Sequence, residues 1–400
     1  MGLNSSSPRE RVLAVLQRRT PDRLVYAPNY WQWFMHHRNH GLLPPEFADC
    51  GSQLEFLRRL GVDVFSRNLY CDPTRRWFGG LAVEVWDGVE VEERCFVEGR
   101  DTITERTFHT GKGLLTERLR YLFADSTLIQ EKFLLDDFTT QFDAFEELVR
   151  ARRWRFDAQL YQQWQTRVGE AGVVEAGELF SPLKMLHLAA GAERSVFLLA
   201  DHPERCRDWI CLHEAAQIDL VGQMLDAGVP VMMAMDNLDS AFHTPRLVEH
   251  CSAGFYERAS RLCRERGAAF FIHACGRQKA LLPLIGSLGV DGLEGVAYPP
   301  LGDVRLEEAL RWSGERLIVT GGVSVFETEQ LADYDAVRRY LEDLLSRVAP
   351  YRHRFVLSSS CNTSIRTPWT ALVWFRNAWW ELTGGVADFP IRATKSQMLW

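Results

Sequence analysis

The chain has 400 residues, of which 46% are hydrophobic and 25% charged, and its net charge is −7 at pH 7. This composition is typical of a globular protein with a large core, and the negative charge argues against a nucleic-acid partner. No run of about eighteen apolar residues occurs, and the first residues lack the apolar segment of a secretory signal. Nine scattered cysteines do not resemble a disulfide framework. We therefore expect a cytoplasmic protein without a membrane span.

Eight short apolar runs of strand type alternate with helical stretches along the chain. These runs are 24–28, 62–66, 173–177, 229–236, 268–275, 290–296, 316–322 and 355–361. Two long amphipathic helices are predicted at 203–228 and 244–267, the second opening on Thr244 and Pro245. The alternation predicts a single α/β domain, residues 1–400, folded as a (β/α)8 TIM-type barrel. A doubly wound open sheet is the alternative.

One interval breaks this rhythm, because about a hundred residues separate the second predicted strand from the third. Residues 67–171 are therefore expected to be an insertion that covers one end of the barrel. Segments 81–99 and 102–123 alternate polar and apolar residues as β-hairpins do, and 136–172 is typical of helices. Four tryptophans in or near long loops would ordinarily pack between insertion and barrel, with stacking on a substrate as the alternative. They are Trp31, Trp33, Trp77 and Trp86.

The strand at 268–275 carries the candidate chemistry. Alternate residues of a strand share a face, so Phe271, His273 and Cys275 point the same way. His273 and Cys275 lie at the carboxyl end, where barrel enzymes place their active sites. Cys361 ends the eighth predicted strand and could return to the same end. Two thiolates and an imidazole suit Zn²⁺, and three protein ligands leave the open position of a catalytic site. A structural histidine beside a free thiol is the alternative for the first pair.

Three acidic residues lie at or near predicted strand ends, and each is a candidate fourth ligand. We favour Glu178 as that ligand, and we assign Asp236 and Glu294 as catalytic candidates, Asp236 as a substrate-positioning group. The alternatives are hydrogen bonding to loop amides for Asp236 and helix-cap or solvated roles for the two glutamates. No dinucleotide-binding or P-loop glycine motif occurs. The candidate substrate-binding residues are Tyr30, Trp31, Trp33 and Asn237.

Several segments resemble the uroporphyrinogen decarboxylase superfamily. RERVLAVLQRRTPDRLVYAP (9–28) is similar to its first helix, Pro-Asp-Arg turn and first barrel strand. Residues 233–276 resemble its fourth strand, the following helix and the fifth strand, and 289–322 resemble its sixth and seventh strands. The stretch 177–191 is similar to the segment after its third strand. The resemblance implies the barrel fold.

Two branches of that superfamily differ in chemistry. The decarboxylase branch carries an arginine-rich segment after the first strand that binds porphyrinogen carboxylates, whereas 29–47 here contains only Arg38. The zinc-dependent methyltransferase branch carries H-x-C and a distant cysteine as zinc ligands. His273, Cys275 and Cys361 fall on those positions. The segment 362–382 resembles the stretch that leads into the last helix of this branch. It departs at 362–364, where Asn-Thr-Ser replaces the usual glycine or proline, which puts the loop shape in question.

The resemblance implies a methyltransferase that moves a methyl group between a small methylated compound and a carrier. The compound would be a methoxylated aromatic, an amine or a thiol. The chain lacks the D-x-H-x-x-G pattern that ligates corrinoid cobalt, so a corrinoid (cobalamin) would be free or supplied by a partner protein. Tetrahydrofolate is the alternative carrier, and a homodimer is one assembly that the resemblance implies. Metal-free decarboxylation of a tetrapyrrole or another carboxylate is the alternative activity, and a non-catalytic barrel the third possibility.

Overall fold

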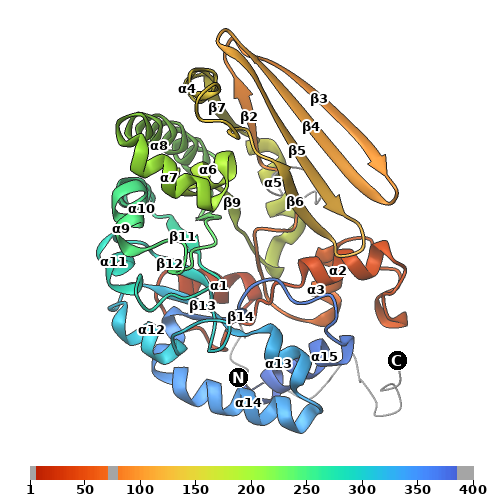
Figure 1. Ribbon diagram of the computed structural model, residues 1–400. Helices are drawn as coiled ribbons and strands as arrows, with labels where there is room; N and C mark the ends of the chain where they lie inside the picture. The colour runs from red at the N-terminus through yellow and green to blue at the C-terminus, as the bar shows by residue number, and fades with distance from the viewer. Residues whose placement is uncertain (1–5, 71–79, 385–400) are drawn as a thin grey trace.

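The computed structural model describes residues 6–70 and 80–384. Its centre is a parallel sheet of six strands in the order β14-β13-β12-β11-β10-β9 (Figure 1). The strands are β9 (Ala176–Leu179), β10 (Val231–Ala234), β11 (Ala269–His273), β12 (Gly292–Val296), β13 (Ile318–Val323) and β14 (Phe355–Ser359). Neighbours in the sheet come from consecutive parts of the chain, and helices connect them, as parallel pairing requires. The predicted α/β class with a parallel sheet is confirmed.

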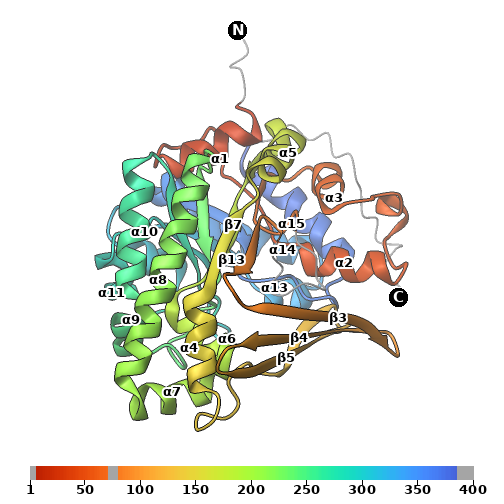
Figure 2. The ribbon, with the colours of Figure 1, turned by 90° about the horizontal axis from the view of Figure 1, so that it is seen from above.

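Helices pack on the outer side of this sheet (Figures 1 and 2). The predicted helix 203–228 corresponds to α8 (Pro203–Asp226). The predicted helix 244–267 is instead broken at Ser252 into α9 (Pro245–Cys251) and α10 (Ala253–Glu265). Thr244 caps α9, because its side chain accepts the Leu247 N–H at 3.3 Å. The helices after β9 are α6 (Pro182–Ala190), α7 (Ala192–Asp201), α8 (Pro203–Asp226), α9 (Pro245–Cys251), α10 (Ala253–Glu265), α11 (Leu282–Ser287), α12 (Leu306–Trp312), α13 (Val325–Gln330), α14 (Tyr334–Val348) and α15 (Trp369–Leu382).

The first three predicted strands are shorter and less regular. Residues 24–28 contribute one parallel bridge, between Tyr26 and Leu357 of β14. The Asp63 N–H donates to the Tyr26 carbonyl at 2.9 Å just before the next strand, and the third predicted strand is divided at Glu175. The elements before and around them are α1 (Pro8–Leu16), α2 (Trp31–Asn39), α3 (Gln53–Leu60), β1 (Val64–Ser66) and β8 (Gly172–Val174), with β1 and β8 paired in parallel.

An antiparallel region lies between β1 and β8. It consists of β2 (Ala82–Trp86), β3 (Glu90–Glu98), β4 (Asp101–Thr110), β5 (Gly113–Leu122), β6 (Thr127–Lys132), α4 (Phe142–Ala151), β7 (Arg152–Phe156) and α5 (Ala158–Val168). Strands β3 to β6 form one sheet that runs from α4 toward α2 (Figure 2).

Two predictions for this region are wrong. Segment 81–99 is no hairpin, because β2 pairs with β7 and β3 pairs with β4. Segment 136–172 is not all helical, because β7 lies within it. The sequence RRWRF alternates buried and exposed residues, and it completes a strand pair with β2.

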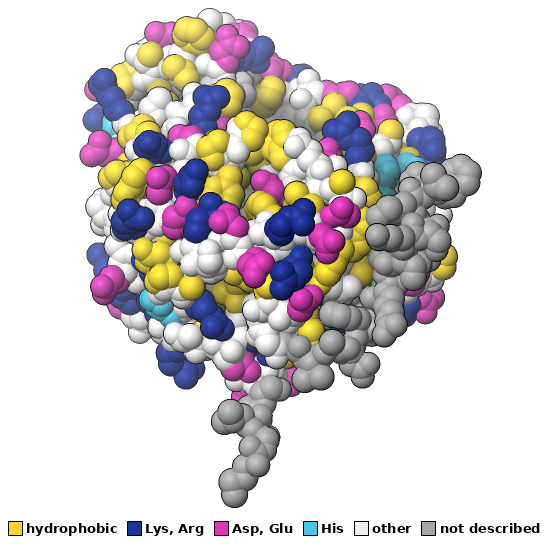
Figure 3. Space-filling view, turned by 90° about the horizontal axis from the view of Figure 1, so that it is seen from below, with side chains coloured by type: hydrophobic (Ala, Val, Ile, Leu, Met, Phe, Trp, Pro, Cys, Tyr) yellow, Lys and Arg dark blue, Asp and Glu magenta, His cyan; other side chains and the backbone are white. Residues whose placement is uncertain are grey.

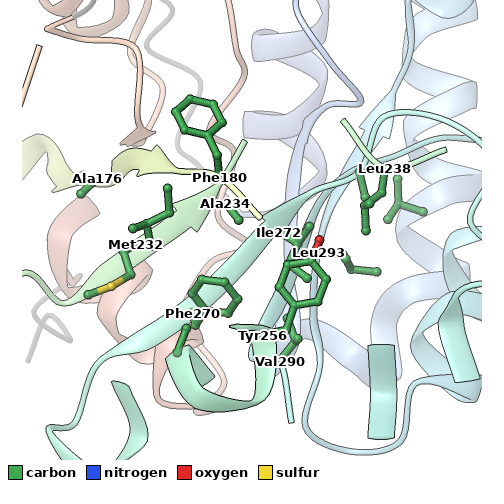
Figure 4. Close-up of a cluster of buried hydrophobic side chains, with 14 of the residues drawn as sticks. Ala176, Phe180, Met232, Ala234, Leu238, Tyr256, Phe270, Ile272, Val290 and Leu293 are labelled. Carbon is green, nitrogen blue, oxygen red and sulfur yellow. The ribbon is translucent and has the colours of Figure 1, made fainter. Parts of the chain in front are cut away.

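The side chains of the parallel strands separate into two apolar clusters. Met232, Phe270 and Ile272 face the helices (Figure 4). Met233 and Phe271 belong to a second cluster on the other side of the strands, which we call the inner side. Gly292 leaves room there for the Phe271 ring, since a Cβ at 292 would lie 2.4 Å from it. Phe271 and His273 are two positions apart on β11 and therefore point to the same side of the sheet. The inner side thus ends in the imidazole of His273 at the carboxyl edge.

No described helix combines the length and the apolar character that a bilayer crossing needs. On the face shown in Figure 3, acidic and basic side chains are interspersed. A phosphate backbone would instead favour a field of positive charge.

Candidate metal centre

Three side chains from two strands meet at the carboxyl edge of the parallel sheet. His273 is the last residue of β11, Cys275 follows two positions later, and Cys361 follows β14 by two positions. One ligand atom from each lies within 4.8 Å of the others. Because β11 and β14 are three positions apart in the sheet, a flat sheet would separate them by about 14 Å. The sheet therefore curves around its inner side, and that curvature brings the ligand atoms together.

Glu294 fixes the imidazole of His273. It lies on β12 directly beside His273 in the strand register, and its Oε2 contacts Nδ1 of the ring. Arg67 Nη2 donates to Glu294 Oε2 at 3.2 Å and lies 3.3 Å from the same Nδ1. When the Nδ1–H is donated to Glu294, Nε2 remains as the lone-pair donor for a metal ion. The carboxylate thus selects the tautomer that can act as a ligand.

Burial and neighbouring charges set the protonation of the group. Burial opposes the charge of Glu294, yet Arg67 and His273 lower its pKa to about 2. Burial also opposes the charge of His273, but Glu294 raises the pKa of the imidazole to about 9. A hydrogen bond from Cys275 lowers the pKa of Cys361, and the same contact raises the pKa of Cys275. The contact between the two sulfurs therefore favours a thiolate on Cys361 over a thiolate on Cys275.

A cavity of about 590 Å³ borders both cysteines. Its wall includes residues from distant parts of the chain, among them the loop after Cys361, Gln32 of α2, Asp125 of the β5–β6 turn and Thr127 at the start of β6. Gln32 Nε2 donates to Thr127 Oγ1 at 2.9 Å and so joins α2 to the antiparallel sheet. This volume lies in the range of about 300–1,000 Å³ that is typical of small-molecule sites. The remaining lining residues are Leu301, Val325, Asn362, Ser364, Ile365 and Arg366.

The structure places the other two acidic candidates away from the sulfurs. Among the described residues, the group of ligand atoms does not include Glu178. The Leu81 N–H instead donates to Glu178 Oε1 at 3.3 Å, and burial raises the pKa of Glu178 to about 7. Asp236 is fully buried, and its carboxylate accepts the Ser181 N–H at 2.9 Å and the Tyr256 hydroxyl. Hydrogen bonding to a loop amide, the alternative stated for Asp236, is what these contacts show.

The aromatic candidates for substrate binding lie in the core. Tyr30, Trp31 and Trp33 are each at most 3% exposed. The Tyr30 hydroxyl lies 2.6 Å from the Tyr26 hydroxyl, and Trp33 Nε1 donates to the Thr367 carbonyl at 2.8 Å. None of the three lines the cavity beside the cysteines. These are packing contacts, and substrate binding by the three residues stays a prediction.

The remaining candidates are placed as follows. Asn237 is exposed just after Asp236, with a φ of +52° that asparagine tolerates better than most residues. Trp86 packs edge-on against Phe108 with ring centres 5.2 Å apart. Trp77 lies outside the described residues.

Two residues of the site, Arg67 and Gln32, were not predicted from the sequence. Arg67 directly follows β1 and is 7% exposed. Its position after a predicted strand was the one indication in the sequence that it could lie at the site. Gln32 stands between two buried tryptophans on α2, and its neighbours gave no indication that it alone of the three faces the cavity. Pairing partners and helix rotation depend on tertiary packing, which local sequence does not encode.

The fold and site define a parallel α/β protein with a His-Cys-Cys group at the carboxyl edge of its sheet. The family description "Uroporphyrinogen decarboxylase (URO-D)" matches residues 166–381, more than half of the 400 residues. The chain therefore belongs to the uroporphyrinogen decarboxylase family, as the sequence resemblance predicted. The search of curated proteins gave no match.

Solved structures support the fold. A methyltransferase from Methanosarcina mazei matches 94% of this chain and 99% of its own, with a TM-score of 0.57 and 12% identity. At that identity the match establishes a shared fold. A D-psicose 3-epimerase from Clostridium cellulolyticum H10 also matches, over 57% of this chain and 83% of its own. Its TM-score of 0.34 at 10% identity is too low to establish a shared fold.

Proposed function

We propose that this protein is a zinc-dependent methyltransferase that moves a methyl group between a small methylated compound and a carrier. The observation that carries the proposal is the convergence of His273, Cys275 and Cys361, with ligand atoms within 4.8 Å, beside a cavity of about 590 Å³. The Methanosarcina protein of the same fold is described as a methyltransferase, which supports the same activity here.

The proposal includes the closure of the strands into one barrel. The bridge from Tyr26 to Leu357 would join residues 24–28 to β14, and the Asp63 N–H to Tyr26 would join them to β1. The Glu175 N–H donates to the Ser66 carbonyl at 3.1 Å, which supports continuity from β1 through β8 to β9. Residues 67–171 would then be an insertion within a single domain, and its β5–β6 turn would form part of the cavity wall.

The donor set fits zinc. Two thiols and one imidazole with its Nδ1 held by Glu294 are the chemistry that zinc prefers, and an adjacent cavity gives access to the fourth position. When bound, zinc would stabilise a thiolate or polarise the group from which a methyl departs. Zinc in a site with three protein ligands retains an open position, which distinguishes a catalytic from a structural site.

The residues around the ligands would hold the site rigid. Glu294 accepts the Nδ1–H of His273 and keeps the lone pair of Nε2 in place, while Arg67 balances the Glu294 charge. Leu301, Val325 and Ile365 supply apolar wall next to the cysteines. An apolar wall excludes water from the reacting group and strengthens electrostatic interactions there.

The carrier is proposed to be a corrinoid, free or held by a partner protein, with a folate-type carrier as the alternative. Either carrier would approach through the open side of the cavity. The methylated compound would be a methoxylated aromatic, an amine or a thiol. A homodimer is the proposed assembly.

The experiment is a metal assay combined with a screen of methylated compounds in the presence of reduced cobalamin or tetrahydrofolate. We expect about one zinc per chain and methyl transfer to one of the carriers, with both lost in Cys361→Ala. A zinc-free protein that transfers methyl groups at the same rate as the zinc-loaded one would contradict the proposal.

Metal-free decarboxylation is the second candidate, because the matching family is described by that reaction. Among the arginines that the structure describes, Arg366 lines the cavity, and its Nε lies 3.9 Å from Glu329 Oε1. Arg67 is paired with Glu294, and Arg38 is exposed on α2. Porphyrinogen turnover that persists after chelation of the metal would favour this candidate over methyl transfer.

A further inference from the structure

A second polar group lies beside the metal centre, on the helix that follows β9. Lys184 and His187 are one turn apart on α6 and therefore share a face. The His187 ring lies 5.0 Å from the ring of His243, which precedes α9. Lys184 and His187 are both partly exposed. We call Lys184, His187 and His243 the α6 cluster.

Hydrogen bonds place the α6 cluster at the same edge as the metal ligands. The Ser181 N–H, just before α6, donates to Asp236 at 2.9 Å, and the Leu238 N–H donates to the His273 carbonyl at 3.1 Å. Burial lowers the pKa of Lys184, whereas Asp236 and Cys275 both raise it. The ammonium group is therefore within electrostatic reach of the carboxylate and of a metal-ligating sulfur.

The ammonium group of Lys184 has no direct partner in the part of the chain that the structure describes. Within the described residues its ammonium forms no ion pair and no hydrogen bond, although most of the side chain is enclosed. Asp236, whose charge raises the pKa of Lys184, already accepts the Ser181 N–H and the Tyr256 hydroxyl. Because the Lys184 side chain is partly exposed, its ammonium group is accessible to a ligand of opposite charge.

His243 adds a buried donor without a partner. The side chain is 5% exposed, and its Nε2 has no hydrogen-bond partner among the described residues. Its Nδ1 lies 3.2 Å from the Asp239 N–H and 3.3 Å from the Asp239 carbonyl. That carbonyl already accepts the N–H groups of Phe242 and His243. Nδ1 therefore acts as the acceptor, and the neutral ring carries its proton on Nε2.

We propose that the α6 cluster is an anion subsite that binds a carboxylate of the substrate beside the metal centre. One ammonium and one neutral imidazole N–H match a monoanion, whereas a dianionic phosphate would retain an unbalanced charge. The inference rests on the proposed methyl transfer and narrows its substrate to methylated compounds that carry a carboxylate. The subsite would hold that carboxylate while the methyl group lies toward Cys275 and Cys361.

Titration of the zinc-loaded full chain, labelled with ¹⁵N-histidine, tests the subsite. The probe is acetate at constant ionic strength, with acetamide as its uncharged counterpart, and the readout is the imidazole resonances of His187 and His243. We expect acetate to shift both resonances saturably and acetamide to leave them unchanged. Lys184→Met should raise the acetate dissociation constant about tenfold or more, because a hydrogen bond to a charged group is lost.

Lys112→Met is the matched control, because Lys112 lies in the exposed turn between β4 and β5. His243→Gln is a second variant that should weaken the acetate response of His187. An acetate response that is absent in the wild type, or unchanged in Lys184→Met, would overturn the subsite. The titration needs no methyl transfer, so its failure would refute the subsite alone, and loss of zinc or of methyl transfer would refute the proposed function alone.

Discussion

Two buried carboxylates at the edge of the sheet have opposite surroundings. Glu294 lies between Arg67 and His273, and these partners lower its pKa to about 2 although it is fully enclosed. Glu178 lies beneath the start of the antiparallel region, where burial raises its pKa to about 7 despite hydrogen bonds from the Leu81 and Gly80 backbone. The charged partners of a strand-end carboxylate, and not its position, decide whether it is ionised and supports a metal ligand.

The largest expected effect is the loss of zinc affinity, which should follow from a change in the Glu294 region and not from one in the Glu178 region. Cys361→Ala should lower zinc affinity by about 100-fold or more, because one of three protein ligands is lost. Cys211→Ala is the control, since Cys211 is an exposed free cysteine on α8. Zinc content after gel filtration measures the outcome. Zinc that is retained in Cys361→Ala but lost in Glu178→Gln would transfer the metal site to the Glu178 region.

Glu178 should make the free energy of unfolding depend on pH. Its folded-state pKa of about 7 lies above that of an exposed glutamate, so the stability it contributes is present below about pH 4.5 and is lost as pH rises through 7. Glu178→Gln should remove this loss and gain about 3 kcal/mol over the wild type between pH 4.5 and pH 8. Urea unfolding of both proteins at the two pH values measures the difference. A difference that is the same at both pH values would mean that folding leaves the pKa of Glu178 unchanged.

The corresponding change in the other region should affect the metal. Glu294→Gln removes the charge that holds His273 and should weaken zinc binding by about 10- to 100-fold. Competition with a chromophoric chelator measures the affinity. Glu178→Gln is the matched control and should leave zinc affinity within about twofold, since Glu178 lies outside the ligand group. Equal losses in the two variants would remove the distinction between the carboxylates.

The smallest expected effect is a loss of stability when the hydrogen bonds of Tyr70 to the backbone near Glu178 are removed. The Tyr70 hydroxyl accepts the Gly177 N–H at 2.9 Å and donates to the Glu175 carbonyl at 3.0 Å. Tyr70→Phe should lower the free energy of unfolding by about 1–2 kcal/mol through these lost hydrogen bonds. Zinc affinity should not change. A loss of zinc without a loss of stability would link this region to the metal centre after all.

The sequence predicted most of the parallel sheet because its strands are continuous apolar runs. All six central strands fall within the predicted runs or overlap them, and the parity of β11 correctly placed Phe271 and His273 on one side. The region between β1 and β8 was harder. Strand β7 was missed because RRWRF looks like part of a charged helix, and only its pairing with β2 makes it a strand.

The candidate metal ligands could be predicted because chemistry and strand-end position coincide for them. The rest of the site could not. Trp31 and Trp33 were more conspicuous than Gln32, yet the rotation of α2 buries the tryptophans and turns the glutamine to the cavity. Glu178 and Glu294 look alike in the sequence. Tertiary packing places Arg67 beside Glu294 and backbone amides beside Glu178, and the local sequence does not show this difference.

X-ray absorption at the zinc edge of the purified protein tests the central claim most directly. The account predicts one zinc per chain with two sulfurs at about 2.3 Å and the remaining ligands nitrogen or oxygen at about 2.0–2.1 Å. Cys361→Ala should reduce the sulfur count to one in whatever zinc remains. Four sulfurs, no sulfur, or no stoichiometric zinc would contradict the assignment of His273, Cys275 and Cys361 as an open zinc site.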